Sequence, residues 1–292
     1  MVIGGTWSFF RILEQERRVN MSDWIWKNYH NGIFSVSHQL WKPSNNPGTA
    51  IMQTWIIEGE EKVLVIDSGT PEITGFRNCL ENRFEKPIVM FLSHGHIDHI
   101  GCLSQFDDCW CSKRDWPMLL KSWDGTVLHK NYEELSCRLH NIDEGDRIDL
   151  GGRIIRVFAI KGHTPGSLML LDERTKILFS GDSVARRILY GLDYWNPLDQ
   201  YLKTLENLSK IEIRGIASMH DDFLLPTEEP SYIVEEIINR LEGCERIWEL
   251  PGTTRKFLYM KNDLGEDNIN YFEMVLPLER KEEAVSQIQG FL

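Results

Sequence analysis

Residues 93–99 decide the fold, and they read Ser93-His94-Gly95-His96-Ile97-Asp98-His99. They directly follow residues 87–92, a nearly continuous apolar run that is typical of a strand covered on both faces. In an extended segment, residues two apart point the same way, so His94 and His96 can hold one metal ion. Asp98 and His99 then face a neighbouring ion. The sequence therefore predicts a turn that serves two metal ions.

The composition describes a globular chain with a small-molecule substrate. Of the 292 residues, 42% are hydrophobic and 26% are charged, and no apolar run approaches the length of a membrane span. The formal net charge of -12 argues against binding to nucleic acid or anionic lipid, because both need clustered Lys and Arg. We therefore expect one large α/β domain without a nucleic-acid or membrane partner. The sequence leaves open whether the chain forms a homodimer.

The ends of the chain and its cysteines carry separate expectations. Residues 1–24 lack the features of a secretory signal, so we expect a dispensable N-terminal extension. Residues 25–245 are expected to form the main domain, and residues 246–292 a hairpin and a short helix packed on it. The six cysteines are too few for a disulfide framework and indicate reduced thiols in the cytoplasm. Alternation along a strand explains Cys109 and Cys111 more simply than a metal site does.

The rest of the pattern alternates between strands and helices. Apolar runs predict strands at 32–38, 49–57, 62–66, 87–92, 153–160, 168–171, 176–179 and 211–218. Helical spacing predicts helices within 113–140, at 201–208 and at 232–241. Segments 256–260 and 269–276 predict the final hairpin. This mixture indicates an α/β fold.

Together with other motifs, the histidine-rich turn resembles the signature of the metallo-β-lactamase superfamily, a His-x-His-x-Asp-His loop after a buried strand. Further motifs follow in the family's order: Gly162-His163-Thr164-Pro165-Gly166, then Ser180-Gly181-Asp182, then His220 after a later strand. Asp67 resembles the family's early aspartate. The matched elements run from about residue 32 to residue 220, roughly two-thirds of the chain.

The resemblance implies a fold and a ligand set. The fold is a four-layer αβ/βα sandwich with the metal site at the edge between its two sheets. One divalent ion would be bound by His94, His96 and His163, the other by Asp98, His99 and His220, with Asp182 as the bridge. Asp67 and Ser93 would steady the metal loop from behind the ligands. Zinc suits these donors, and iron or manganese would also accept them.

The resemblance also implies a metal-dependent hydrolase. A metal-bridging hydroxide would be the nucleophile, with Asp98 orienting it, and the bond cleaved would be an ester, thioester, lactone or phosphoester of a small molecule. The motifs do not choose among these bonds. Ser167 stands where glyoxalase II-like thioesterases and lactonases commonly carry His, which lowers the expectation for both classes. Asp221 follows His220 where many relatives have glycine.

Six residues are candidates for contact with the substrate: Lys161, Arg186, Arg187, Tyr190, Tyr194 and Trp195. Lys161 precedes the second histidine motif, where it can touch an acidic group, although a solvated loop lysine explains it as well. The arginines follow Asp182 and can bind a carboxylate or phosphate, and the aromatic residues can hold an apolar tail. Packing explains Tyr194 and Trp195 equally well.

Three alternatives to a hydrolase share the motifs. A mononuclear iron sulfur-oxygenase uses part of the ligand set, and the complete set of seven ligands disfavours it. A non-catalytic binding domain is disfavoured for the same reason, because no ligand is replaced. A nuclease is disfavoured by the acidic charge balance.

Overall fold

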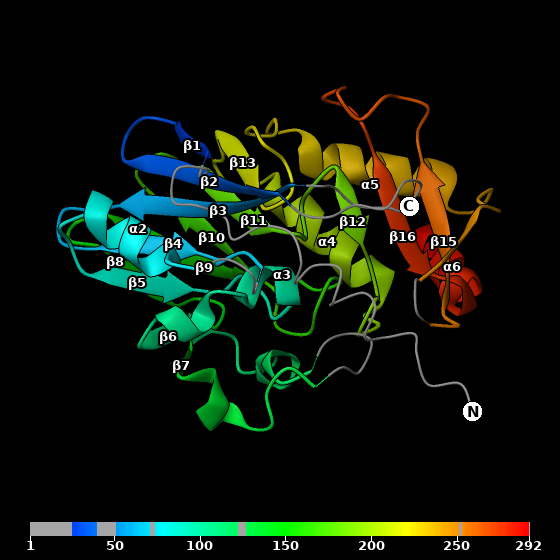
Figure 1. The fold of residues 1–292 in the computed structure, drawn as a ribbon. Coiled ribbons are helices and arrows are strands. Elements are labelled where there is room, and N and C mark those ends of the chain that lie inside the picture. Colours follow the sequence, from blue (N-terminus) through cyan, green and yellow to red (C-terminus); the bar gives the residue numbers. More distant parts are fainter. Residues whose placement is uncertain (1–24, 40–50, 71–73, 122–126, 251–252, 292) are drawn as a thin grey trace.

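The fold is a sandwich of two β-sheets between helices (Figure 1). The computed structural model describes residues 25–39, 51–70, 74–121, 127–250 and 253–291. The predicted extension at 1–24 lies outside the described residues. The predicted four-layer αβ/βα arrangement is confirmed.

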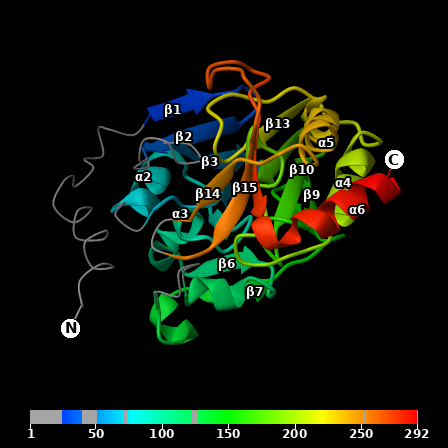
Figure 2. The same ribbon diagram turned by 90° about the vertical axis from the view of Figure 1, so that its right-hand side faces the viewer.

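Helices cover the outer faces of both sheets. They are α2 (Phe76–Arg83), α4 (Leu198–Leu208), α5 (Glu229–Arg240) and α6 (Lys281–Phe291), whereas the short helix α3 (Ile97–Ile100) lies at the sheet edge after β5. Helix α2 lies on one side of the sheets, and helices α4, α5 and α6 lie on the other (Figure 2). Within the described ranges, none of the helices combines the length and the apolar character that a membrane span requires.

The first sheet has seven strands in chain order. They are β1 (Ile25–Asn28), β2 (Ile33–Gln39), β3 (Ile51–Glu58), β4 (Val63–Ile66), β5 (Ile88–Phe91), β6 (Asp108–Cys111) and β7 (Arg138–Asn141). Strands β1 to β4 pair antiparallel, and β4 to β7 pair parallel. The carboxyl ends of β4 and β5 therefore meet at one edge, which carries residues 93–99. In β6, Cys109 and Cys111 alternate with less buried residues, as predicted.

The second sheet has the order β13-β11-β10-β9-β8. Its strands are β8 (Arg147–Asp149), β9 (Ile154–Ala159), β10 (Leu168–Asp172), β11 (Ile177–Gly181) and β13 (Gly215–Ser218). The last of these is shorter than the predicted strand at 211–218. Because β11 and β13 pair parallel, their carboxyl ends lie side by side. Asp182 and His220 follow these two ends.

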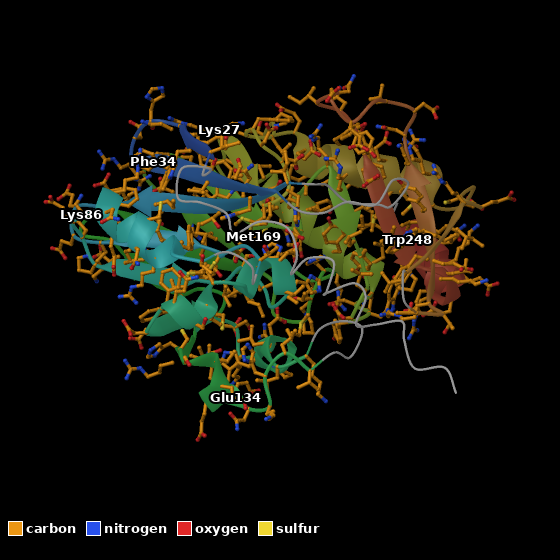
Figure 3. The ribbon with its side chains drawn as sticks, in the orientation of Figure 1. Lys27, Phe34, Lys86, Glu134, Met169 and Trp248 are labelled. Atoms are coloured by element: carbon orange, nitrogen blue, oxygen red, sulfur yellow. The ribbon has the colours of Figure 1, made fainter. Side chains whose placement is uncertain are left out.

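Both sheets are buried on two faces, which explains the continuous apolar runs. In β10, Leu168 and Leu170 pack between the sheets, while Met169 and Leu171 pack under helices α4 and α5. Met169 lies near the centre of the molecule, whereas Glu134 lies at its periphery (Figure 3). The core thus has three layers, and the layer between the sheets fixes their separation.

A third sheet contains the C-terminal strands in the order β12-β16-β15-β14. Its strands are β12 (Arg187–Leu189), β14 (Ile247–Glu249), β15 (Lys256–Lys261) and β16 (Glu273–Pro277). The predicted final hairpin is confirmed as the antiparallel pair of β15 and β16, although β16 begins later than predicted. Met274 of β16 and Ile288 of α6 share a core with α4 and α5. The domain boundary between residues 245 and 246 stays a prediction.

The helices predicted within 113–140 are wrong for the residues that the structure describes. Trp116–Leu119 and Tyr132–Leu135 each form one short 3-10 turn, and the chain then enters β7. Pro117 lies in the first turn, and the Asn131 side chain accepts two backbone N–H groups and starts the second. Each of these turns has four residues, far fewer than the roughly 12 that a stable helix needs.

The inter-sheet layer gives a test of the fold. Leu170→Ala should lower the free energy of unfolding by about 2–5 kcal/mol, because the leucine is 0% exposed and its loss leaves a cavity between the sheets. Leu264→Ala, at a position that is 38% exposed, should change it by less than about 0.5 kcal/mol. Urea unfolding measures both values. Equal effects of the two substitutions would contradict this core assignment.

Candidate metal centre

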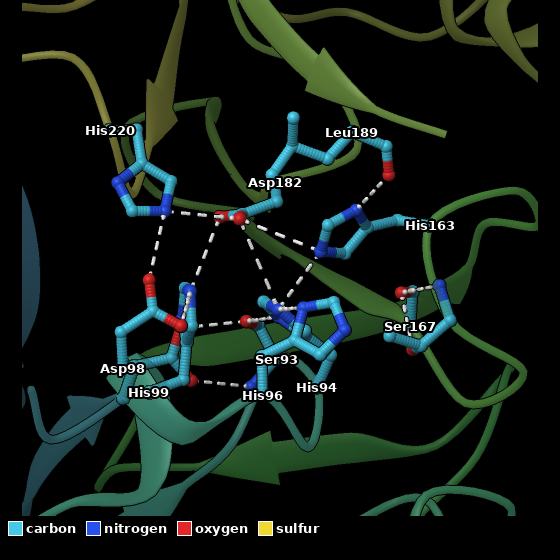
Figure 4. A network of polar contacts seen from close by, with 12 residues as sticks. Ser93, His94, His96, Asp98, His99, His163, Ser167, Asp182, Leu189 and His220 are labelled. Carbon is cyan, nitrogen blue, oxygen red and sulfur yellow. Dashed lines mark hydrogen bonds and ion pairs between the residues drawn. The ribbon is translucent and has the colours of Figure 1, made fainter. Parts of the chain in front are cut away.

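The seven predicted metal ligands follow the ends of strands, in turns or in the short helix α3, and their side chains meet in one cluster (Figure 4). His94, His96, Asp98 and His99 follow β5, and the last two lie in α3. His163 lies between β9 and β10. The turns therefore bring residues from both sheets into one cluster.

Three imidazoles form the first group. His94 Nε2 lies 3.1 Å from His96 Nδ1 and 3.1 Å from His163 Nε2. The three nitrogens lie within 4.8 Å of one another, and all three side chains are buried. Such spacing is suited to three donors around one cation.

A second group contains one carboxylate and two imidazoles. His220 Nε2 lies 3.5 Å from Asp98 Oδ2, and His99 Nε2 lies 3.7 Å from Asp98 Oδ1. The donor atoms of Asp98, His99 and His220 lie within 4.8 Å of one another. The structure thus gathers the two predicted ligand groups separately.

Asp182 lies between the two groups. Its Oδ2 is 3.1 Å from His220 Nε2 and 3.5 Å from His163 Nε2. Its Oδ1 is 3.5 Å from His99 Nε2. One carboxylate therefore faces both groups, which is the position that a bridging ligand needs.

Two buried atoms of this cluster have no hydrogen-bond partner in the described part of the chain, His99 Nε2 and Asp182 Oδ1. An unpaired buried polar atom is costly unless a partner satisfies it. A cation would satisfy the lone pairs of both atoms. The imidazole and carboxylate donors suit zinc, iron and manganese. The residues present therefore fit divalent metal ions.

Asp67 and Ser93 orient the first ligands. Asp67 accepts hydrogen bonds from the Ser93 amide at 2.7 Å, from Ser93 Oγ at 2.7 Å and from His99 Nδ1 at 2.8 Å. Ser93 Oγ, in turn, lies 3.0 Å from His94 Nδ1. These contacts occupy the Nδ1 atoms of His94 and His99 and leave their Nε2 atoms for the cluster.

Backbone carbonyls orient two other histidines. His163 Nδ1 donates to the Leu189 carbonyl at 2.8 Å, and His220 Nδ1 donates to the Ile51 carbonyl at 2.9 Å. With Nδ1 engaged, each ring presents Nε2 to Asp182. The tautomer that a metal ligand needs is thus set by the fold.

Asp193 is a supporting residue that the sequence patterns missed. Its Oδ2 accepts a hydrogen bond from His96 Nε2 at 2.5 Å, which directs Nδ1 of this ring toward His94. Burial acts to lower the pKa of His96, but the contact with Asp193 outweighs it and raises that pKa. No motif or spacing marks Asp193, which lies in a loop far from His96 in the sequence.

Most of the predicted substrate contacts are engaged inside the protein. Arg186 Nε lies 2.6 Å from Asp221 Oδ1, and Arg187 Nη2 lies 3.0 Å from Glu266 Oε2. Both arginine side chains are buried, but Glu266 is 51% exposed, so of these two pairs only that of Arg186 with Asp221 is a buried ion pair, which is strongly destabilising to break. Both arginines are therefore engaged in ion pairs within the protein, and a contact between either of them and the substrate stays a prediction.

The other candidates lie in different surroundings. Tyr190 is 0% exposed and donates to the Asn196 carbonyl, so it is a packing residue. Trp195 Nε1 donates to Glu283 at 2.9 Å, and Lys161 Nζ lies 3.3 Å from Gln200 Oε1. Tyr194 is 45% exposed and directly follows Asp193, so solvent reaches its side chain.

The histidines of the cluster differ in the direction in which their pKa values are shifted. Burial lowers the pKa of His94 well below its ordinary value, and it lowers that of His163 to about 4. Burial also acts on His99 and His220, but the carboxylates, Asp182 above all, outweigh it. They raise the pKa of His99 well above its ordinary value and that of His220 to about 9. Without metal, protons therefore balance the charge of Asp182.

Comparison with known sequences points to one family. A model described as metallo-beta-lactamase superfamily matches residues 53–218. The acyl-coenzyme A thioesterase MBLAC2 of Homo sapiens is 27% identical over 219 residues, which cover 65% of this chain and 77% of that enzyme. The hydroxyacylglutathione hydrolase GloC of Haemophilus influenzae is 26% identical over 200 residues, which cover 64% of this chain and 89% of that enzyme.

Solved structures resemble the fold. A beta-lactamase domain protein from Burkholderia ambifaria has a TM-score of 0.59 at 18% identity, with 80% of each chain covered. A metallo-beta-lactamase from Pontibacter korlensis has a TM-score of 0.58 at 14% identity, with 74% of this chain and 100% of that chain covered. At such identities the likeness concerns the fold alone.

The raised pKa of His220 gives a test of metal binding. At pH 7 its imidazole is protonated in the metal-free protein, so a metal ion that binds there must displace the proton. Zinc binding should release about one proton more from the wild-type protein than from His220→Ala at pH 7, and the difference should vanish as the pH rises above about 9. Calorimetry in buffers of different ionisation enthalpy measures the release. Equal release from both proteins at pH 7 would contradict a role of His220 as a ligand.

Proposed function

The chain belongs to the metallo-β-lactamase superfamily and is a metal-dependent hydrolase of small molecules, and we propose that it cleaves thioesters. The main structural support for a metal-dependent hydrolase is that Asp182 lies between the two ligand groups and faces both of them. The thioester is supported by the names of two relatives, an acyl-coenzyme A thioesterase and a hydroxyacylglutathione hydrolase. Both names describe thioester substrates.

The sequence departure at Ser167 is compatible with this substrate. Ser167 Oγ accepts a hydrogen bond from the Thr164 amide at 3.1 Å and lies 2.7 Å from Thr164 Oγ1. The serine therefore stabilises the turn that carries His163. A serine at this position is therefore compatible with the complete ligand set of this chain.

The proposed centre holds two zinc ions. His94, His96 and His163 would bind one ion, Asp98, His99 and His220 the other, and Asp182 would bridge them. When bound, the two ions lower the pKa of water and polarise the carbonyl oxygen of the substrate, so hydrolysis at neutral pH needs no separate strong base.

Asp98 is the proposed catalytic residue among these ligands. Its side chain is 28% exposed, whereas that of His220 is 13% exposed and that of Asp182 is 8% exposed. Water and substrate therefore reach Asp98 first. Its carboxylate can accept a hydrogen bond from the attacking water and hold that water in line with the carbonyl carbon. The thiolate that leaves needs no general acid, because it is stable near neutral pH.

The compartment and the partners follow from charge and thiols. Six cysteines in a chain of this length are too few for a disulfide framework, which supports a reducing compartment, the cytoplasm. The formal net charge of -12 supports the absence of a nucleic-acid partner.

Removing the bridge tests the shared centre. Asp182→Ala should lower the hydrolysis rate by at least about 100-fold, because the nucleophile loses its position and the second ion binds more weakly. Ser183→Ala, one residue on, removes a buried hydroxyl outside the ligand set and should cost far less. Elemental analysis measures the metal content of both variants, and steady-state kinetics measures their hydrolysis rates. Near-full activity of Asp182→Ala with both ions retained would exclude the bridging role.

A substrate panel tests the thioester. The zinc-loaded protein should release free thiol from an acyl-coenzyme A and from a hydroxyacylglutathione, as followed with a thiol-reactive dye. An aromatic lactone and a phosphodiester serve as competing substrates, and the metal-free protein is the control. Hydrolysis of the lactone or phosphodiester without any release of thiol would overturn the thioester proposal and leave the metal centre standing.

A further inference from the structure

A buried aspartate outside the ligand set joins two of the ligand turns. Asp115 precedes the 3-10 turn Trp116–Leu119 and is 2% exposed. Its Oδ2 accepts a hydrogen bond from the Gly95 amide at 3.1 Å, and its Oδ1 accepts one from the Gly166 amide at 2.6 Å. Gly95 lies between His94 and His96. One carboxylate thus contacts the turn of these two ligands and the turn that follows His163.

A hydroxyl strengthens the contact with the second turn. Thr164 Oγ1 donates to Asp115 Oδ2 at 2.6 Å, and Thr164 directly follows His163. Since its proton goes to the carboxylate, Thr164 Oγ1 accepts from Ser167 Oγ at 2.7 Å. Asp115 therefore receives three donors, and all of them belong to the two ligand turns.

The glycines of both motifs fit this arrangement. A Cβ atom at Gly166 would lie 2.7 Å from Asp115 Oδ1, and one at Gly95 would lie 2.9 Å from Met118 Cβ. Neither distance is tolerated without a shift of the chain. Glycine at these two positions lets the backbone approach Asp115 closely enough to donate.

We propose that Asp115 is a positioning residue, which fixes the turn of His94 and His96 relative to the turn of His163. The result is the convergence of three imidazole nitrogens, in which His94 Nε2 lies 3.1 Å from His163 Nε2. This inference rests on the metal centre proposed above. It assigns the affinity of the three-histidine site in part to a residue that touches no metal.

The chemistry of the donors explains why an aspartate is required. A carboxylate offers only acceptors, and it faces two amide N–H groups and one hydroxyl. The amide of asparagine would turn an NH₂ group toward one of these donors. Asp115→Asn keeps the shape of the side chain and should release one of the two turns.

The test compares Asp115→Asn with Asp149→Asn. Asp149 Oδ1 also accepts two glycine amides, those of Gly151 and Gly152 at 2.9 Å, in a turn that carries none of the proposed ligands. Zn²⁺ is titrated into each metal-free protein in competition with a chromogenic chelator, and thermal melting of the metal-free proteins is recorded. Asp115→Asn should bind zinc at the three-histidine site about 10- to 100-fold more weakly, and Asp149→Asn as tightly as the wild type.

Each outcome decides the inference. The inference would be overturned if the Asp115→Asn variant bound zinc as tightly as the wild type. It would also be overturned if Asp149→Asn lost as much zinc affinity as Asp115→Asn. If Asp115→Asn does not fold, Thr164→Val and Thr164→Ser replace it. The valine variant should then bind zinc more weakly while the serine variant, which keeps the hydroxyl, restores binding, and equal affinities of the two would overturn the inference. A wild-type protein that binds no zinc would instead refute the metal centre itself.

Discussion

The carboxylate of Asp182 contacts imidazoles from both sheets, and the geometry of the whole centre depends on this contact. Its oxygens lie within 4.0 Å of the Nε2 atoms of His94, His99, His163 and His220. Burial alone would raise the pKa of Asp182, but His220 and His99 outweigh it and hold that pKa well below its ordinary value. A buried carboxylate in this state needs cationic neighbours. Protons meet that need without metal, and divalent ions would replace them.

Strand β3 of the first sheet holds the last ligand turn in place. The Trp55 indole donates to the Ser218 carbonyl at 2.8 Å, and the Gln53 amide donates to the Met219 carbonyl at 2.6 Å. The carbonyl of Ile51, in the same strand, orients the ring of His220. These bonds join the two sheets directly beside the cluster. Hydrogen bonds from β3 to the end of β13 and the turn after it therefore help to fix the distance between the ligand groups.

Sequence patterns predicted features that depend on neighbouring residues, and they missed contacts between residues that are far apart in the chain. The ligand turn and most of the strands follow from short motifs and apolar periodicity, and the supporting role of Asp67 was implied by the family resemblance. His96 and Asp193 are 97 residues apart, and no pattern in one chain pairs them. The same reason applies to Arg186, whose charge was visible while its partner Asp221 was not. Apolar spacing within 113–140 came from two separate turns and was misinterpreted as helical.

The C-terminal sheet is connected to the metal centre through the residues that orient its histidines. The Leu189 carbonyl fixes His163, and Leu189 pairs with Val275 at the end of β12. Asp193, which fixes His96, lies a few residues farther along the same segment. Strands β14, β15 and β16 lie outside the range that the family model matches, whereas β12 lies inside it. Relatives that differ in this sheet can therefore reshape the surroundings of two histidines while keeping every ligand. Specificity can diverge in this way without loss of the common chemistry.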